Sequence, residues 1–356
     1  MKELSEQAKM NQPVTRHWFV LIPRFNMFAL SGLLEPARVA NYLSPTPLYS
    51  QNFISFDGEV ISASNGMTIN CEQPPSKIDR NDVVFVVGSW GCEHYNNTKM
   101  LPWIRLQSRS GVRLCAVEMA SYIFARAGLL AGKLATTQWS YLAGFHEQYP
   151  DTIVSEQLFT EDGLMMSCSG GGSCVDLMLY LIQKDHGNAL AGEISDQILH
   201  HPVRPGNTPQ RKTLGRRLVT LEPGVRAAID LIERNMSEPP SVPEIADTIG
   251  ISQRQLERQF NKAVGCTVVQ FGLLLRLQHS RVLLISTDLG VREIATASGF
   301  NSLSHFAYAF KKCFGRRPSE YRQAWPEQDT TPHWPGTLSK FLETLKAKND
   351  LKQSQK

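Results

Sequence analysis

The pattern of apolar and polar positions is most regular toward the C-terminal end, where one pattern occurs twice. Residues 241–265 and 290–315 both contain Glu-Ile-Ala, then a glycine, then a helical pattern of basic and aromatic residues, then a second glycine. In the first copy, Ile245 and Ile249 recur at helical spacing, which predicts one buried helix face. Gly250 follows and can adopt the positive φ that ends a helix. The repeat predicts two copies of one small motif.

Each copy continues into a second helix with its own buried stripe. Leu256, Phe260 and Val264 recur at helical spacing in the first copy, and Ser252 is a suitable N-cap. A long apolar and basic helix is expected over 268–285, where it can hold both copies at a fixed separation. The sequence therefore predicts two helix-turn-helix motifs, each able to place its second helix in the major groove of DNA.

The outward positions of these second helices are the expected DNA contacts. Arginine can bond guanine bidentately and glutamine can bond adenine, whereas other basic residues contact phosphates. Charge agrees, because 211–322 hold 17 Lys and Arg against 10 Asp and Glu, while 1–210 hold 15 against 19. The expected base contacts are Arg254, Gln255, Glu257, Arg258, Ser304, His305 and Tyr308, and the expected phosphate contacts are Lys311, Lys312 and Arg316.

The N-terminal half alternates short apolar runs with helical patterns. The run 83–87 is entirely apolar, which is typical of a buried strand in a parallel sheet. Asp-Gly and Asn-Gly pairs within 52–69 indicate turns between short strands. This alternation predicts a doubly wound α/β domain of flavodoxin-like type, followed by an all-α domain. Further strands are expected at 17–22, 112–117, 153–159 and 164–168, and helices at 33–43, 101–110, 118–127, 136–149, 174–184 and 190–201.

Changes in composition mark the expected domain boundaries. The stretch 201–215 holds Pro, Gly and basic residues without periodicity, which indicates a linker. The expected order is a flexible arm at 1–16, a ligand-sensing domain at 17–200, the linker at 201–221, a DNA-binding domain at 222–325 and a tail at 326–356.

Composition also bears on the compartment. No apolar run reaches the roughly 18 residues of a membrane span, and the N-terminus lacks an apolar signal region, so a cytoplasmic protein is expected. The seven cysteines show no CxxC pairing and no metal-ligand spacing. Buried reduced thiols are expected, with no metal and no cofactor.

About a hundred C-terminal residues follow an ordered pattern. The pattern consists of Ile245-Ala246, Ser252…Leu256…Phe260, Arg276-Leu277…Ala295…Gly299-Phe300…Phe306…Phe310-Lys311 and Gly315…Pro318…Tyr321-Arg322. Through these residues the region resembles the AraC family of bacterial transcription regulators.

The N-terminal half carries a second pattern. It consists of Ala29…Glu35-Pro36…Arg38…Ala40-Asn41, Ala63-Ser64…Gly66, Ala125…Ala127-Gly128-Leu129-Leu130, Thr136-Thr137…Trp139 and Gly170-Gly171…Asp176-Leu177. This half resembles the PfpI-like branch of the class I glutamine amidotransferase superfamily. The whole chain resembles the GlxA-type regulators, which fuse such an amidotransferase-like domain to an AraC-type one.

Enzymes of that superfamily place a cysteine at a strand-to-helix elbow, where helix amides lower its pKa. Here the elbow falls on Glu118, and Cys115 lies three residues earlier in the expected strand. The family's histidine before Trp139 is Gln138, and its acidic partner falls on Ala29. Glutamine cannot act as a general base, so an inactive domain is expected. An amidase- or glyoxalase-type enzyme with an accessory DNA-binding domain is the alternative.

Ligands of open α/β sheets bind beyond the carboxyl ends of the strands, where several aromatic residues and Glu118 are expected. Aromatic faces attract cationic amines, and Glu118 adds a counter-charge. Similar regulators respond to glycine betaine, carnitine or amino acids, so the resemblance implies an amine or amino-acid-derived effector. Purely structural roles for most of these residues are the alternative. The expected ligand-binding residues are Phe25, Phe28, Trp90, Glu118, Met119, Tyr122, Gln138 and Trp139.

The expected partners are double-stranded operator DNA, the small effector and a second copy of the chain, with RNA polymerase as a further candidate. The first domain is the expected dimerisation surface, since the second already contains two DNA-reading motifs. A first domain that only dimerises, without sensing a ligand, remains a further alternative.

Overall fold

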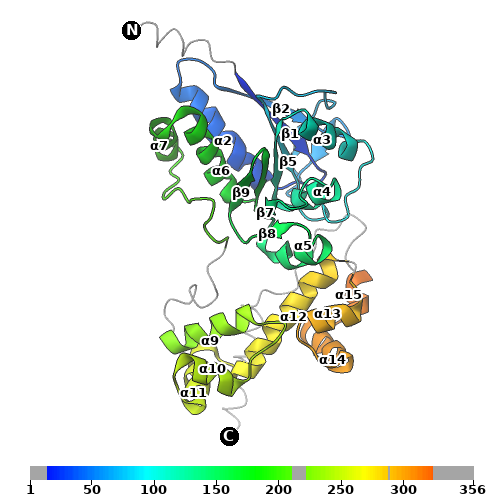
Figure 1. Ribbon diagram of the computed structural model, residues 1–356, viewed down its shortest axis with the longest axis vertical. Helices are drawn as coiled ribbons and strands as arrows, with labels where there is room; N and C mark the ends of the chain where they lie inside the picture. Colours follow the sequence, from blue (N-terminus) through cyan, green and yellow to red (C-terminus); the bar gives the residue numbers. More distant parts are fainter. Residues whose placement is uncertain (1–13, 211–221, 288, 324–356) are drawn as a thin grey trace. The chain divides into compact units, whose positions relative to one another are not determined.

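The computed structural model describes residues 14–210, 222–287 and 289–323. The chain divides into two compact units, Met1–Gln210 and Arg211–Lys356 (Figure 1). Most of the expected arm, the linker residues 211–221 and the tail 326–356 lie outside the described residues.

The first unit is built around a six-stranded sheet. Its strands are β1 (Thr15–Leu21), β2 (Tyr49–Ile54), β5 (Val83–Val87), β6 (Arg113–Val117), β9 (Phe159–Asp162) and β10 (Met165–Cys168). They lie in the order β2-β1-β5-β6-β10-β9, parallel except for β9, which pairs antiparallel with β10. Every residue of β5 is buried, as its apolar run predicts.

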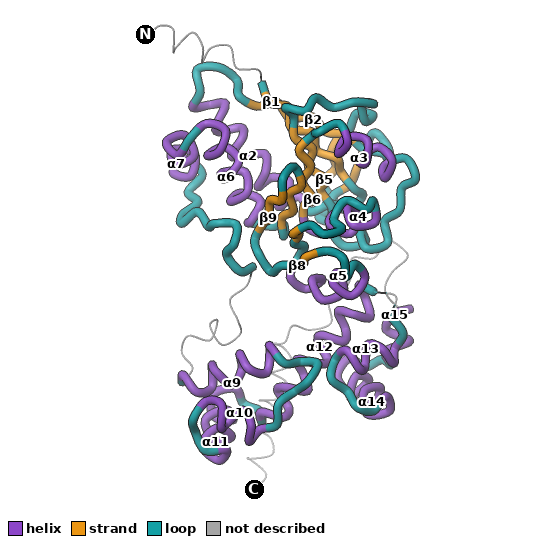
Figure 2. The backbone as a smooth tube through the Cα atoms, viewed as in Figure 1, coloured by secondary structure: helices purple, strands orange, loops and turns teal. Residues whose placement is uncertain are grey.

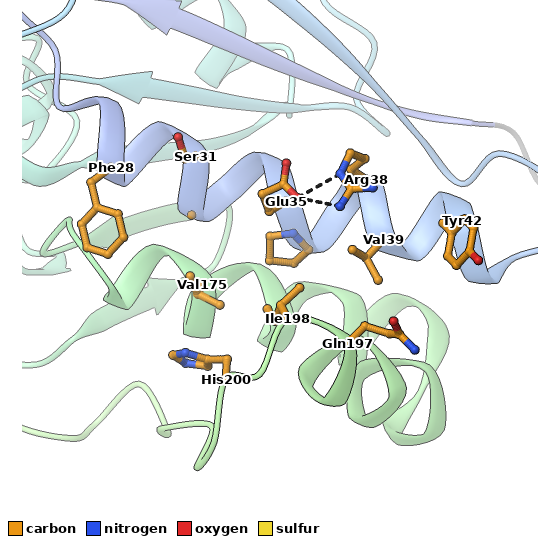
Figure 3. Close-up of a pocket in the computed structure, with 12 residues that line it drawn as sticks. Phe28, Ser31, Glu35, Arg38, Val39, Tyr42, Val175, Gln197, Ile198 and His200 are labelled. Carbon is orange, nitrogen blue, oxygen red and sulfur yellow. Dashed lines mark hydrogen bonds and ion pairs between the residues drawn. The ribbon is translucent and has the colours of Figure 1, made fainter. Parts of the chain in front are cut away.

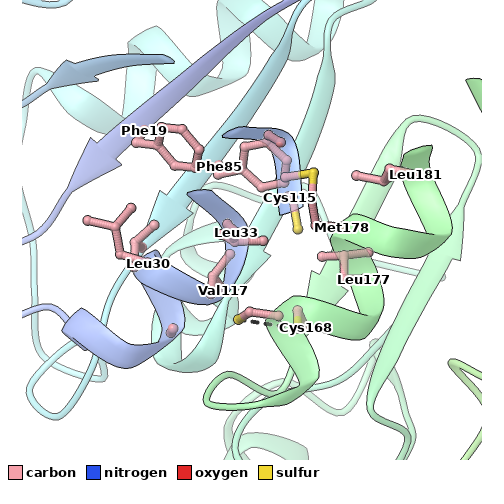
Figure 4. Packing of buried hydrophobic residues seen from close by; sticks show 14 of the residues in the cluster. Phe19, Leu30, Leu33, Phe85, Cys115, Val117, Cys168, Leu177, Met178 and Leu181 are labelled. Carbon is pink, nitrogen blue, oxygen red and sulfur yellow. Dashed lines mark hydrogen bonds between the residues drawn. The ribbon is translucent and has the colours of Figure 1, made fainter. Parts of the chain in front are cut away.

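Helices cover both faces of the sheet (Figures 1 and 2). One face carries α2 (Met27–Leu43), α6 (Ser173–His186) and α7 (Asn188–Gln197), and the other carries α3 (Met100–Arg109), α4 (Ser121–Arg126) and α5 (Leu142–Gln148). Successive strand residues point to opposite faces, so Phe19 and Phe85 pack in the first core while Val20 and Val84 pack in the second. Figure 4 shows Phe19 and Phe85 in the core formed with α2 and α6. The predicted doubly wound architecture is confirmed.

The helix α2 begins earlier than the sequence analysis predicts. Its N-cap is Asn26, whose side chain accepts hydrogen bonds from the amides of Phe28 and Ala29. Pro36 therefore lies within the helix instead of in its first turn. The expectation of a loop before residue 33 is wrong because the Asn26 cap lets the helix begin at Met27.

Two other local predictions are also wrong. The expected helix 136–149 is a 3-10 turn, η2 (Trp139–Tyr141), followed by α5. The expected strand 153–159 is reduced to β8 (Ile153–Val154), which pairs with β7 (Leu134–Ala135) outside the main sheet. The turns expected within 52–69 do separate short strands, since β3 (Val60–Ser62) pairs antiparallel with β4 (Thr68–Asn70).

The second unit is helical throughout its described part. Its helices are α9 (Pro223–Arg234), α10 (Val242–Ile249), α11 (Gln253–Val264), α12 (Val268–Ser286), α13 (Val291–Ala297), α14 (Leu303–Phe314) and α15 (Pro318–Gln323). The pair α10–α11 forms the first predicted helix-turn-helix motif, and α13–α14 forms the second. Gly250 ends α10 at a φ of 74°, and the Ser252 side chain accepts from the Gln255 amide, as predicted.

The helix α12 joins the two motifs. It packs against α9 and α11 and also against α13, α14 and α15. Its segment Val268–Ile285 has the length and composition of a membrane span, which the sequence analysis did not anticipate, and 56% of it is buried. Phe271, Leu274 and Leu277 are among its buried residues, so this apolar surface serves the core of the second unit.

Candidate ligand site and DNA-contacting surface

The strand β6 ends in a sharp turn at Glu118, which begins the 3-10 turn η1 (Glu118–Ala120). Glu118 has a φ of 61°, a left-handed conformation that side-chain-bearing residues rarely adopt. The elbow expected at Glu118 is therefore confirmed, and its backbone is strained. Gly170, with a φ of 89°, lies directly against it, since an added Cβ would lie 2.8 Å from the Glu118 Cβ. The loop before α6 thus covers the elbow through the backbone of Gly170, which has no side chain.

The Glu118 carboxyl group is buried beneath this loop. Burial raises its pKa from 4.5 to about 8, although hydrogen bonds from the side chains of Asn26 and Ser89 lower it. One carboxyl oxygen, Oε2, has no hydrogen-bond partner among the described residues. The Thr137 hydroxyl donates to the Glu118 carbonyl oxygen at 2.8 Å. The elbow therefore holds a carboxyl group that is mostly protonated at neutral pH and incompletely bonded.

Three expected ligand residues have exposed side chains. Phe28, Trp90 and Trp139 each follow one of the contacting residues by one or two positions in the sequence. They are 63%, 39% and 40% exposed, respectively. The Phe28 ring also lies within 4.0 Å of the position that a Cβ on Gly171 would occupy, one residue beyond the loop glycine that covers Glu118. The sequence thus brings three exposed rings within two residues of the groups that contact Glu118, and Phe28 lies beside the loop that covers it.

The other expected ligand residues are placed differently. Phe25, Met119 and Tyr122 are fully buried and belong to the two cores of the first unit. The Gln138 side chain caps η2 by accepting from the Ser140 amide at 2.8 Å. Position after a strand in the sequence does not show which way a side chain points, and these four side chains pack in the two cores or cap a turn.

The cysteine nearest the elbow and the position of the family's acidic partner are both enclosed in the core. Cys115 is fully buried within β6, and Ala29 is fully buried within α2. Cys168 and Cys174, which the sequence analysis did not single out, lie with their Sγ atoms 3.8 Å apart, both fully buried. Among the described residues, no three metal-binding side chains gather at one place.

The end of the first unit returns to the elbow. Gln210 donates through its side-chain amide to the carbonyl oxygen of Thr137 at 2.8 Å, and the hydroxyl of that threonine contacts the elbow. Arg204 pairs with the fully buried Asp176 through its side chain and its amide. Residues 201–210 of the expected linker therefore lie on the first unit, held by these hydrogen bonds.

A separate groove of about 630 Å³ runs along α2, opposite α6 and the end of α7 (Figure 3). Figure 3 shows Phe28 toward one end and Tyr42 toward the other. Its only carboxylate, Glu35, is paired with Arg38 at 2.8 Å. Glu118 does not line this groove, and its Oε2 is one of several buried polar atoms without a hydrogen-bond partner among the described residues.

The expected DNA contacts lie on the surface of the second unit. On α11, the polar positions point outward while Leu256 and Phe260 are buried, and on α14 the buried residues are Phe306, Ala309 and Phe310. All ten expected residues are exposed: Arg254, Gln255, Glu257, Arg258, Ser304, His305, Tyr308, Lys311, Lys312 and Arg316.

Four contact residues of the first unit were missed from the sequence. Asn26 had a detectable signal, because asparagine before a helical pattern is a common N-cap. Ser89, Arg204 and Gln210 had none, since their contacts lie far away in the sequence.

Known proteins resemble both units. Residues 20–184 match the DJ-1/PfpI family, and residues 245–324 match a helix-turn-helix domain. The chain is 34% identical over 308 residues to the HTH-type transcriptional regulator GbdR of Pseudomonas aeruginosa, covering 86% of this chain and 84% of GbdR. It is 35% identical over 309 residues to the regulator CdhR of the same species, covering 87% and 92%.

The HTH-type transcriptional regulator GlxA of Rhizobium meliloti is 30% identical over 311 residues, which cover 87% of this chain and 96% of GlxA. These matches run through both units and span most of each relative. The chain therefore belongs to the GlxA-type transcription regulators of the AraC family, and it is a DNA-binding regulator whose first unit has the DJ-1/PfpI fold.

Proposed function

We propose that the first unit senses a small cationic amine or an amino-acid-derived molecule at the elbow, and that it catalyses no reaction. The observation that carries this proposal is the buried Oε2 atom of Glu118, which has no hydrogen-bond partner among the described residues. A buried polar atom without a partner is costly, and a bound ammonium group would supply the missing interaction. The exposed rings of Phe28, Trp90 and Trp139 would add cation–π attraction.

The protonation state of Glu118 gives the proposed site a distinctive pH dependence. The pKa of Glu118 is about 8, so at lower pH the carboxyl group is mostly neutral, whereas a cation prefers the carboxylate. Binding would therefore release a proton, and affinity would rise by up to about tenfold per pH unit between pH 6 and pH 8. Glu118→Gln should remove this dependence, because an amide does not ionise.

The experiment begins with a thermal-shift screen of quaternary amines and basic amino acids, since a ligand of the folded form raises the melting temperature. Calorimetric titration of the best compound in two buffers of different ionisation heat then measures the protons released. Trp139→Ala should weaken binding, whereas Tyr42→Ala is the matched control because Tyr42 is an exposed ring at the far end of the groove. Binding without proton release would overturn the role of Glu118.

The absence of catalysis is a separate part of the proposal. The elbow offers a carboxyl group in place of a thiol, and Gln138 cannot replace a general base. Purified protein should show no amidase or glyoxalase turnover. Turnover that is lost in Glu118→Ala would contradict this part.

The proposal also assigns roles on the DNA-binding surface. Arg254, Gln255, Glu257 and Arg258 would face bases in one major groove, and Ser304, His305 and Tyr308 would face bases in the next. Lys311, Lys312 and Arg316 would contact phosphates.

One observation favours the alternative of a unit that dimerises without sensing. The groove along α2 exposes Phe28 and Tyr42, and such aromatic surface is common at contacts between protein copies. Light scattering of the full chain with Phe28→Asp and Tyr42→Asp tests this alternative. Dissociation of a dimer by both changes, together with no ligand from the screen, would favour dimerisation alone.

A further inference from the structure

The two helix-turn-helix motifs are connected by more than the helix α12. The turn of the second motif contains Gly299, whose φ is 73°. A Cβ at this glycine would lie 2.4 Å from the carbonyl oxygen of Met236 and 3.0 Å from that of Ser237. Both carbonyls belong to the segment between α9 and α10, just before the first motif. The backbone of one motif's turn therefore rests on the backbone beside the other motif.

The equivalent glycine of the first motif has no such neighbour. Gly250 also has a left-handed conformation, with a φ of 74°, but a Cβ there would meet nothing within 4 Å. The repeat thus places two glycines at matching turns, and only Gly299 is pressed against another part of the unit. Its role extends beyond ending a helix.

Arg276 of α12 holds the same turn from the other side. Its Nη1 donates to the Gly299 carbonyl oxygen at 2.8 Å, and its guanidinium carbon lies 4.9 Å from the centre of the Phe300 ring. Burial lowers the pKa of Arg276, as expected for a guanidinium partly enclosed by protein. The planar guanidinium group can stack on the Phe300 ring and donate to the Gly299 carbonyl oxygen at the same time, which a lysine ammonium group cannot do.

Phe300, which contacts Arg276, also contacts the second recognition helix, α14. Its ring is nearly buried and lies 5.0 Å from the Phe306 ring and 5.8 Å from the His305 ring. Phe306 anchors α14 in the core, and His305 is an exposed residue at the start of that helix. A continuous path of contacts therefore runs from α12 through Arg276 and Phe300 to the expected DNA-contacting face.

We propose that Arg276, with Gly299, is a positioning residue that fixes the second recognition helix relative to the first. It acts without contacting DNA and sets the number of base pairs that the protein prefers between its two sub-sites. One added base pair moves a sub-site by about 3.4 Å and turns it by about 35°. Rigid motifs reject such a shift, whereas loosely joined motifs tolerate it.

The test uses the full chain and a DNA duplex selected from a random pool by the wild-type protein. Fluorescence anisotropy then measures affinity for this duplex and for versions with one base pair added or removed between the sub-sites. The wild type should lose about tenfold or more on each altered duplex. Arg276→Met should bind all three duplexes within about threefold of one another, with weaker binding to the selected one.

Matched variants separate positioning from charge and from folding. Arg276→Lys keeps the charge and should still lose the spacing preference, and the salt dependence of Arg276→Met should equal that of the wild type. Gly299→Ala should lose the preference, while Gly250→Ala, which adds similar strain in open space, should keep it. Full spacing preference in Arg276→Met, or its rescue by lysine, would overturn the proposal.

Discussion

Replacing Glu118 with glutamine should stabilise this protein, and the gain should depend on pH in a defined way. A carboxyl group buried at the elbow favours its protonated form, so its pKa rises from 4.5 to about 8. In the unfolded chain the same group ionises near its ordinary pKa. Between pH 4.5 and pH 8 the folded state therefore holds a proton that the unfolded state has lost. The contribution of Glu118 to folding stability falls through this window as pH rises, and it levels off above pH 8.

The size of the effect follows from the same two values. Each pH unit within the window costs about 1.4 kcal/mol. The accumulated cost is about 1 kcal/mol at pH 5, about 3 kcal/mol at pH 7 and on the order of 5 kcal/mol at pH 9. A glutamine amide has nearly the shape of the protonated acid and cannot ionise. Glu118→Gln should therefore exceed the wild type in stability by these amounts, with the difference growing as pH rises.

Urea unfolding at pH 5, 7 and 9, followed by tryptophan fluorescence, measures both proteins under matched conditions. Comparing the two at each pH cancels every other titrating group. Glu147→Gln is the control, because Glu147 is exposed on α5 and the same change there should give a small and constant difference. A constant difference for Glu118→Gln, or a loss of stability at pH 9, would refute the burial argument.

Four further changes test the surroundings of the elbow and the DNA surface. Gly170→Ala should cost about 1–3 kcal/mol more in urea unfolding than Gly187→Ala, because both glycines have positive φ but only Gly170 lies against a side chain; equal costs would contradict this. Gln210→Leu should cost about 1–3 kcal/mol because it removes the amide that donates to the carbonyl oxygens of Thr137 and Gln157, and the single Thr136 hydroxyl proton can serve only one of them; no loss would contradict it. Arg258→Ala should lower affinity by about 1–3 kcal/mol at one base pair, whereas Lys312→Ala should weaken all sequences and flatten the salt dependence; a uniform loss for Arg258→Ala would contradict its role.

The sequence predicts most of the second unit because its information is local. Helix caps, turn glycines and apolar stripes lie within one turn of one another, so Ser252 and Phe260 take the positions that their spacing predicts. The layers of the first unit also follow from local patterns. The surroundings of the elbow do not follow from local patterns, because they depend on residues that come together from separate parts of the sequence. Position in the sequence could not show that Tyr122 points into the core or that Gln210 returns to this place.

Three glycines show what the sequence pattern predicts and what only the structure shows. In the sequence, Gly250 and Gly299 are equivalent members of a repeat, and Gly170 is one of three consecutive glycines. Each adopts a positive φ, which a turn pattern anticipates. Only the structure shows that Gly250 faces open space, while Gly299 lies against a backbone carbonyl and Gly170 against Glu118. A methyl group would have room at Gly250, whereas at Gly299 and Gly170 it would collide with neighbouring atoms. The contact across the fold, and not the turn itself, therefore makes Gly170 necessary for the elbow and Gly299 necessary for the contact between the two motifs.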